Sequence, residues 1–432
     1  MAALGCVATP TVMRSQAPTR LSLDQAKAMA RLSSPDLRAA REETQAARGR
    51  ELQAGALSNP VLTYSTERTS GSGQSNGQQI AGAEQRIEVG GQRGARRAVA
   101  FYRRRATEAR AEATQASIDF DVASAYAHAI AADRRAALTH QAATAFTEAG
   151  RVSERRLAAG DISVYADRRL RLETARYAAL EAEANLARRS ARMALSALLS
   201  GSADSMSGAS FVLTDSLPTA IPRMSTEQLV ARALRGRADY QVASLELEAL
   251  SAEIRLASLE RIPTPIVSGG FKAEKSAGIP GSLKGFAAGV SMPIPIFDRR
   301  RGAIQAASAD ARRAEAVRES LRRRITREVL EAHDGLLAVE QQRALLAPHL
   351  GPPAAASLRS AQVAYSEGEI TLLEWLDAVR AYHEAESAYS SLVAEFLVRR
   401  ATLERHVSAP LTTLITTADA PGNPGALATE KD

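Results

Sequence analysis

Apolar residues recur at steps of three and four along two long stretches of the chain, in strict alternation in the first and nearly so in the second. The members of the first series are Val99, Tyr102, Ala106, Ala109, Ala113, Ala116, Phe120, Ala123, Ala127 and Ile130. The members of the second are Ile304, Ala307, Ala311, Ala314, Val317, Leu321, Ile325, Val329, Ala332, Leu336 and Val339. This spacing predicts long helices packed as in a coiled coil, and the many alanines allow neighbouring helices to approach closely.

Shorter stretches alternate with a period of two. In "GFAAGVSMPIPI" (285–296) one face would carry Phe286, Ala288, Val290, Met292 and Ile294, and the other Ala287, Gly289 and Ser291. In "PVLTYSTER" (60–68) one side would carry Leu62 and Tyr64, and the other Thr63 and Ser65. About ten residues of such alternation are typical of a transmembrane β-strand. The polar segment "TSGSGQSNGQ" (69–78) is predicted to be a loop between strands.

The sequence contains an internal duplication. Gly94 and Gly302 follow similar strand-to-helix junctions, and Gly160 and Gly368 lie in similar turns; 302 minus 94 and 368 minus 160 both give 208. Upstream, residues 35–64 are echoed by 238–267 at an offset near 203. This period is too long for a solenoid unit and indicates duplication of a whole subdomain. Each half reads helix, strand, loop, strand, long helix, tight turn, long helix, so a chain has four strands, too few to close a barrel alone.

These patterns predict the following domain organisation. The segments are an N-terminal segment 1–20, repeat 1 at 21–200, a Ser-, Gly- and Pro-rich linker at 201–222, repeat 2 at 223–410, and a flexible tail at 411–432. Within the repeats, β-hairpins are expected at 60–89 and 264–296, and helical hairpins with turns near 157–163 and 365–371. Pro348, Pro352 and Pro353 should break the second long helix before its turn.

Composition changes this picture little. Of the 432 residues, 45% are hydrophobic but only 4% are aromatic, which suits long, closely packed helices. No run approaches the 18 apolar residues of a membrane-spanning helix, so a bilayer would be crossed by strands. The formal charge of +7 comes from arginines spread among glutamates, which favours a solvated helical surface over a nucleic-acid patch. The six histidines form no HExxH motif or close ligand pair, and neither catalytic residues nor a cofactor or metal site are predicted.

Cys6 is the single cysteine. The stretch "AALGC" loosely resembles the cleavage box of a bacterial lipoprotein, although the charged and apolar regions of a signal peptide are missing. Cys6 is therefore a candidate lipidation site, with an ordinary terminal residue as the alternative.

Over about residues 21–410 the chain resembles the TolC-like outer-membrane efflux factors. The resemblance is carried by the tandem repeat and by "PDLRAA", "SNPVLTY", "MPIPIFDRRRGAI" and "GEITLLEWLDAVRAYHEAESAY". The junction "IEVGGQRGARR" is most similar to the heavy-metal branch, which serves cobalt–zinc–cadmium or copper pumps. The resemblance implies a mainly α fold: a homotrimer with a 12-stranded β-barrel in the outer membrane, continued by a 12-helix periplasmic tunnel. Its implied partners are outer-membrane lipids, a periplasmic adaptor (membrane fusion) protein and an inner-membrane resistance-nodulation-division pump.

The resemblance also suggests site residues. The helical turns would contact the adaptor, and the candidates are Arg156, Gly160, Ser163, Gly368 and Thr371. Glu374 and Asp377 share one helical face and match acidic positions at the constricted periplasmic entrance of the family. Repeat 1 has Asp167 near the corresponding place, followed by two arginines, so the repeats are not equivalent here. Trp375, beside the acidic pair, is expected to serve packing. A membrane-border collar is expected from Arg93, Arg96, Arg97, Arg299, Arg300 and Arg301.

These features favour a passive export duct over an enzyme. A soluble coiled-coil scaffold would not require amphipathic strands that are followed, twice, by arginine-rich junctions with helices. A nucleic-acid binder would need a clustered basic patch, which this sequence does not show. The cargo stays open, since heavy-metal cations and small organic compounds both fit a duct.

Overall fold

The structure is a computed structural model that describes residues 19–71, 74–200, 211–214 and 224–411. It divides into two compact units, each built from parts of both sequence repeats. Unit 1 comprises Met1–Pro35, Gln115–Leu229 and Glu328–Asp432, and unit 2 comprises Asp36–Thr114 and Val230–Arg327. The two compact units therefore do not coincide with the two sequence repeats, because each unit combines segments from both repeats.

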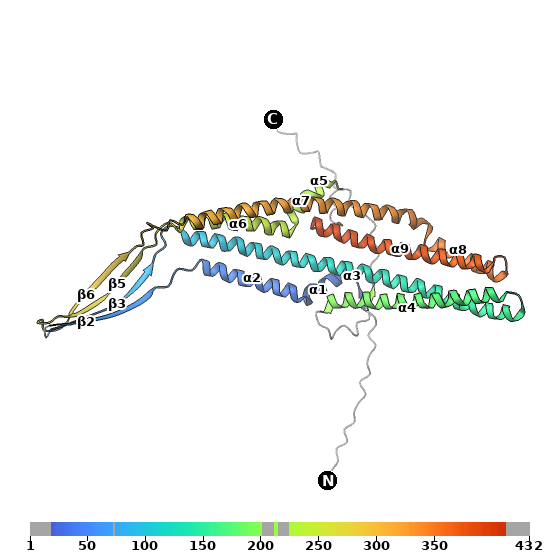
Figure 1. The fold of residues 1–432 in the computed structure, drawn as a ribbon, viewed down its shortest axis with the longest axis horizontal. Helices are drawn as coiled ribbons and strands as arrows, with labels where there is room; N and C mark the ends of the chain where they lie inside the picture. The colour runs from blue at the N-terminus through green and yellow to red at the C-terminus, as the bar shows by residue number, and fades with distance from the viewer. Residues whose placement is uncertain (1–18, 72–73, 201–210, 215–223, 412–432) are drawn as a thin grey trace, which may run out of the picture. The chain divides into compact units, whose positions relative to one another are not determined.

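The order of elements confirms the duplication (Figure 1). The first half contains β1 (Thr19–Leu21), α1 (Leu23–Ser33), α2 (Pro35–Ala54), β2 (Val61–Gly71), β3 (Gln74–Arg86), α3 (Gln92–Ala159) and α4 (Val164–Ser200). The second half contains β4 (Phe211–Leu213), α5 (Thr226–Gly236), α6 (Ala238–Leu259), β5 (Ile266–Lys275), β6 (Leu283–Ser291), α7 (Arg301–Leu346), the 3₁₀ turn η2 (Ala347–His349), α8 (Pro352–Glu367) and α9 (Leu372–Val407).

Unit 2 contains a four-stranded antiparallel sheet in the order β2-β3-β5-β6. Tyr64, Ala81, Phe271 and Phe286 lie in one cross-strand row and therefore on one face. The three aromatic residues of this row are 68%, 78% and 72% exposed. The opposite face carries small or polar residues in the row Thr63, Gly82, Gly270 and Ala287. The alternation predicted from the sequence is thus present, with an uncovered apolar face.

Two sequence predictions about the strands are wrong. The segment 69–78 is not a loop, because β2 continues to Gly71, β3 starts at Gln74, and Ser70 pairs with Ser75; a ladder of backbone hydrogen bonds does not require apolar side chains. The last strand ends at Ser291 rather than reaching 296. Pro293 and Pro295 have no N–H to donate, so they cannot continue the ladder.

The centre of the sheet is held by a close approach of two glycines. A Cβ on Gly82 would lie 2.7 Å from the carbonyl oxygen of Gly269, and one on Gly270 would lie 2.5 Å from that of Ala81. Neither position can accept a side chain without separating β3 from β5.

The long helices bury most of the predicted apolar series. Ala106, Ala109, Ala123 and Ala127 of α3 are at most 6% exposed. In α7 the buried members are Ala307, Ile325, Val329, Ala332, Leu336 and Val339. Two members depart from the prediction, since Ala116 is exposed and Val317 is 54% exposed. The predicted helix break is confirmed: α7 ends at Leu346, and α8 starts at Pro352 after Gly351, whose φ is +71°.

Part of the segment predicted as linker is a strand. β4 pairs in parallel with β1, Thr19 facing Phe211, within unit 1. The Tyr126 hydroxyl donates to the Leu21 carbonyl at 2.8 Å, and Arg192 donates to the Phe211 carbonyl at 3.0 Å. Strands of three residues are too short for a periodic signal, so the sequence did not reveal this pairing. In the part of the chain that the structure describes, no helix is apolar enough over its length to cross a bilayer.

Candidate functional site

The two helical turns, at residues 160–163 (first turn) and 368–371 (second turn), have the same backbone design. Gly160 and Gly368 have φ of +82° and +84° and have no neighbour within 4 Å of where a Cβ would lie. The Asp161 N–H donates to the Arg156 carbonyl at 2.9 Å, and the Glu369 N–H donates to the Ala364 carbonyl at 2.8 Å. These bonds close each helix end in the manner of a Schellman motif, for which a left-handed glycine is favoured.

Each turn then caps the outgoing helix. The Ala166 N–H donates to the Ser163 hydroxyl at 3.2 Å at the start of α4. At the start of α9, the Glu374 N–H donates to the Thr371 hydroxyl at 3.3 Å, and the Thr371 N–H donates back to Glu374 Oε2 at 2.7 Å. This reciprocal capping box is complete only in the second turn, because Ala166 stands where α9 has Glu374.

Glu374 and Asp377 are both exposed and share a face of α9, whereas Trp375, Leu376 and Val379 are buried. Hydrogen bonds from the Thr371 backbone N–H and then from its hydroxyl lower the pKa of Glu374. Arg380 Nη1 lies 3.6 Å from Asp377 Oδ1, so the two side chains form an ion pair. The predicted acidic face therefore exists in the structure, and its first carboxylate also anchors the helix start, a role that the sequence analysis did not assign.

Arg156 links the two turns within unit 1. Its guanidinium donates to the Ser366 carbonyl at 3.4 Å and lies 5.5 Å from the centre of the Tyr365 ring. The turns consequently lie side by side, as Figure 1 shows at the ends of α3 and α8. Arg156, predicted as a contact for another protein, already contacts the second turn of its own chain.

An aromatic cluster underlies the turns. Trp375 is 2% exposed, stacks on Tyr365 with ring centres 5.4 Å apart, and meets Phe146 edge-on at the same distance. Phe146 in turn stacks on Tyr177 at 4.3 Å. The prediction that Trp375 serves packing is confirmed.

The sequence analysis missed the burial of Asp167, which lies just after the first turn. It is 4% exposed, and it accepts hydrogen bonds from the Ser153 hydroxyl at 3.0 Å and from Arg171 Nε at 2.7 Å. At the offset of 208, Asp167 corresponds to Trp375 and not to the acidic pair. That alignment was a signal that the side chain is buried. Repeat 1 thus supports its turn with a polar cluster where repeat 2 uses apolar packing.

We expect Asp167→Ala to destabilise the first helical hairpin by about 1–3 kcal/mol, because the buried Ser153 hydroxyl would lose its acceptor. Thermal unfolding of the purified protein would measure this. Asp161→Ala, at an exposed acidic residue of the first turn, is the matched control and should change stability by less than ~0.5 kcal/mol. Equal unfolding temperatures for the two variants would contradict the assignment.

The arginines of the predicted collar differ in their contacts. Arg96 forms a bidentate pair with Glu88 at 2.5 and 3.0 Å, and Arg93 donates to the Gly55 carbonyl at 2.5 Å. Arg300 has a φ of +54°, its N–H donates to Asp298 at 2.8 Å, and its guanidinium lies 3.5 Å from Glu260. The other three, Arg97, Arg299 and Arg301, are exposed. Cys6, the candidate lipidation site, lies outside the described residues.

Within the described residues, no group of three or more His, Cys, Asp or Glu side chains is arranged to hold a metal ion. The candidate site is therefore a pair of capped turns with an exposed acidic face beside them. Such an arrangement offers surfaces for protein contact and for electrostatic selection of ions.

The chain is similar to known proteins over both repeats. The model of the family described as outer membrane efflux protein matches residues 28–201 and 229–407. The chain is 27% identical over 394 residues, which are 91% of each chain, to the cobalt-zinc-cadmium resistance protein CzcC of Cupriavidus metallidurans. It is 28% identical to the nickel-cobalt-cadmium resistance protein NccC of Alcaligenes xylosoxydans xylosoxydans, covering 74% of this chain and 70% of that one.

Solved structures share its fold. The outer-membrane channel OprN has a TM-score of 0.74 at 21% identity, covering 90% of each chain. CusC, whose solved structures concern conformational changes accompanying folding and transmembrane channel formation, has a TM-score of 0.72 at 19% identity, covering 93% of this chain and 97% of that one.

Proposed function

The chain belongs to the outer membrane efflux protein family, and we propose that it is the outer-membrane duct of a tripartite efflux system that exports heavy-metal cations. The observation that carries the metal cargo is the likeness to a cobalt-zinc-cadmium resistance protein over 91% of both chains. The family consists of channels rather than enzymes, so the duct would pass its cargo without chemistry. An adaptor protein and an inner-membrane pump would deliver that cargo.

The exposed apolar face of the sheet supports the placement of the strands in a bilayer. Tyr64, Phe271 and Phe286 form a row of large side chains on one face, and Leu62 and Val290 of the same face are 85% and 72% exposed. Burying such a face in lipid is favourable, at ~25 cal/mol for each Å² of apolar surface removed from water. Collar arginines at the ends of these strands would lie at headgroup level.

A stripe of exposed apolar residues on α4 supports assembly with further copies of the chain. Tyr165, Leu172, Leu186 and Met193 are spaced by sevens or multiples of seven, and they are 71%, 69%, 61% and 54% exposed. Seven-residue spacing keeps these side chains on one helix face, which we call the α4 stripe. We propose that the α4 stripe packs on a neighbouring chain in a homotrimer, whose sheets together would complete the membrane part.

We expect Leu172→Glu combined with Leu186→Glu to prevent trimer assembly, because charged residues would have to be buried in the interface. Crosslinking in outer-membrane fractions should then yield monomers instead of trimers. Leu32→Glu, at an 80% exposed leucine of α1, is the control and should leave the trimer intact. A double variant that still crosslinks to trimers would rule out the α4 stripe as the interface.

The two turns are proposed to contact the adaptor, and Glu374 and Asp377 to line the entrance. Ser163 and Thr371 would then act indirectly, by fixing the helix starts next to the exposed glycines. Rings of carboxylates contributed by the copies would favour cations over anions.

The cargo is tested by deleting the gene and restoring it on a plasmid. We expect restoration to raise tolerance to zinc, cobalt and cadmium salts without changing tolerance to organic dyes or detergents. If restoration raised tolerance to organic compounds alone, the proposal of a metal cargo would be wrong, but the proposal of an export duct would stand. If tolerance to neither metals nor organic compounds changed, both proposals would be wrong.

A further inference from the structure

Three basic residues share the apolar face of the sheet in unit 2, at the end of the sheet away from α3 and α7. Two rows beyond the aromatic row that contains Phe271 comes the row of Lys284, and two rows further comes the row of Arg68 and Lys275. Because side chains alternate between the two faces along a strand, residues two rows apart lie on the same face. Arg68, Lys275 and Lys284 are all exposed, and we call them the sheet-end cations.

The charged residues of the sheet are divided between its two faces. Along the described strands of this sheet, the face of the sheet-end cations carries no acidic residue. Glu67, Glu84 and Glu274 all lie on the opposite face, where Lys272 Nζ lies 3.0 Å from Glu274 Oε2. Among the described residues, no carboxylate lies within 4 Å of a sheet-end cation. Their three positive charges are therefore not neutralised by the sheet.

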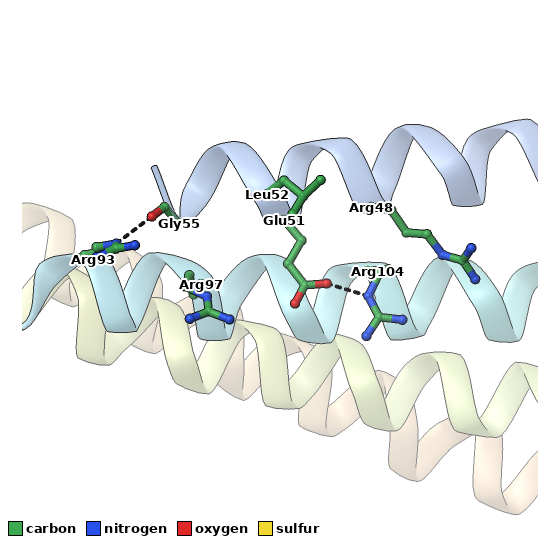
Figure 2. Close-up of a pocket in the computed structure, with 7 residues that line it drawn as sticks. All are labelled: Arg48, Glu51, Leu52, Gly55, Arg93, Arg97 and Arg104. Carbon is green, nitrogen blue, oxygen red and sulfur yellow. Dashed lines mark hydrogen bonds and ion pairs between the residues drawn. The ribbon is translucent and has the colours of Figure 1, made fainter. Parts of the chain in front are cut away.

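The basic residues at the helical end of unit 2 contact their own chain instead. A pocket of about 520 Å³ between α2 and α3 is lined by Arg48, Glu51, Leu52, Gly55, Arg93, Arg97 and Arg104 (Figure 2). In this pocket Arg104 donates to Glu51 at 2.5 Å, and Arg93 donates to the Gly55 carbonyl at 2.5 Å. Figure 2 shows the ion pair of Arg104 between Arg48 and Arg97. A single anion could therefore not contact both of these arginines.

The spacing of the sheet-end cations suits a head group that carries more than one phosphate. Lys275 and Lys284 lie on adjacent strands and two rows apart, so their Cα atoms are separated by about 8 Å. Arg68 is two strands away from Lys275 in the same row, at about 10 Å. Because lysine and arginine side chains are long, Lys275 and Lys284 can reach one phosphate together while Arg68 reaches a second.

The apolar rows next to the sheet-end cations indicate that a lipid carries these phosphates. Phe271 and Phe286, two rows from Lys284, are 78% and 72% exposed. Long basic side chains beside such a face can keep their apolar stems among acyl chains and extend their charged ends to head groups. The strands β3 and β6 run from this end of the sheet toward α3 and α7, as Figure 1 shows. With those helices in the periplasm, this end of the sheet would lie at the outer leaflet.

We propose that the sheet-end cations bind the sugar phosphates of a phosphorylated glycolipid of the outer leaflet. The bound head group would neutralise a face whose charged residues are all basic, and would hold the far end of the sheet at head-group level. This inference rests on the proposed placement of the strands in the bilayer. It concerns the end of the sheet opposite to the arginine collar, and it is independent of the exported cargo.

The test compares the full-length wild type, purified in neutral detergent, with Arg68→Gln/Lys275→Gln/Lys284→Gln. Glutamine keeps a long polar side chain at three exposed positions that form no ion pair within the described residues. The fold should therefore persist, and equal unfolding temperatures would verify that it does. Native mass spectrometry would measure the retention of added bisphosphorylated lipid A, monophosphorylated lipid A and phosphatidylglycerol.

The control is Arg97→Gln/Arg299→Gln/Arg301→Gln, which removes the same charge from exposed arginines of the collar. We expect the wild type and this control to retain bisphosphorylated lipid A in preference to both other lipids. The sheet-end variant should bind it more weakly by about fivefold for each charge removed. Equal losses in the two variants would assign retention to general surface charge and overturn the site.

Two further outcomes depend on the wild type alone and hold even if the sheet-end variant misfolds. If the wild type retained bisphosphorylated lipid A no better than the monophosphorylated form or phosphatidylglycerol, the glycolipid site would be wrong and the proposed duct would stand. If the wild type left the outer-membrane fraction without detergent, the proposed placement of the strands in the bilayer would be wrong, and this inference with it.

Discussion

Replacing Gly368 by valine is expected to abolish metal resistance while leaving the chain folded in the outer membrane. Gly368 has a φ of +84°, a conformation that costs a residue with a Cβ roughly 1–2 kcal/mol. No neighbour lies within 4 Å of the new Cβ, so the helices themselves need not move. The added strain and bulk would fall on the exposed second turn, where we propose that the adaptor docks. Growth on zinc or cadmium and crosslinking to the adaptor would measure the loss.

Gly278 provides a matched control for this experiment. It lies between β5 and β6, has a φ of +87°, and likewise has nothing within 4 Å of a Cβ. Gly278→Val therefore introduces a similar strain at a position outside the proposed contact. Resistance that survives in the Gly278 variant but not in the Gly368 variant would assign the effect to docking. Full resistance in the Gly368 variant would refute the role of the second turn.

Local chemistry made the turns predictable from sequence. A glycine that must be left-handed and a Ser or Thr that caps the next helix leave a short signature, and its recurrence at one offset indicated the same structure twice. The alternation in 60–68 and 285–291 was equally local, since each strand carries its own two faces. The proline-rich end of β6 was misread because apolar spacing continues through Pro293 and Pro295, although their backbone cannot pair.

The features that could not be predicted from the sequence depend on contacts between segments that are distant along the chain. Arg97 becomes part of a pocket only because α2 packs beside α3, and nothing near residue 97 indicates Arg48. Asp167 looks like an exposed acid by composition, yet it is buried because Ser153 and Arg171 supply its donors. Repeat 2 has Trp375 in place of this polar cluster, so the two duplicated hairpins differ in the packing behind turns of similar backbone geometry.

Neutralising both Glu374 and Asp377 is expected to remove most of the cation preference of the channel. The structure determines how this should be done. Alanine at 374 would also dismantle the capping box, whereas Glu374→Gln keeps an acceptor for the Thr371 N–H and removes the charge. In Glu374→Gln/Asp377→Asn, the reversal potential measured in planar bilayers under a salt gradient should move most of the way to zero, because the carboxylates that attract cations are gone.

The lowered pKa of Glu374 adds a second readout to the same experiment. Because the Thr371 N–H and hydroxyl stabilise the ionised carboxylate, it should stay charged at acidities where an ordinary glutamate begins to protonate, and it should lose its charge only as the pH falls through the lowered value. The wild-type preference for cations should accordingly persist into more acidic solution than an unperturbed glutamate would allow. Glu154→Gln/Asp161→Asn, which removes two exposed acids at the first turn, is the charge-matched control. If this control lowers the preference as much as the second-turn variant does, general surface charge governs the entrance and the assignment to Glu374 and Asp377 fails.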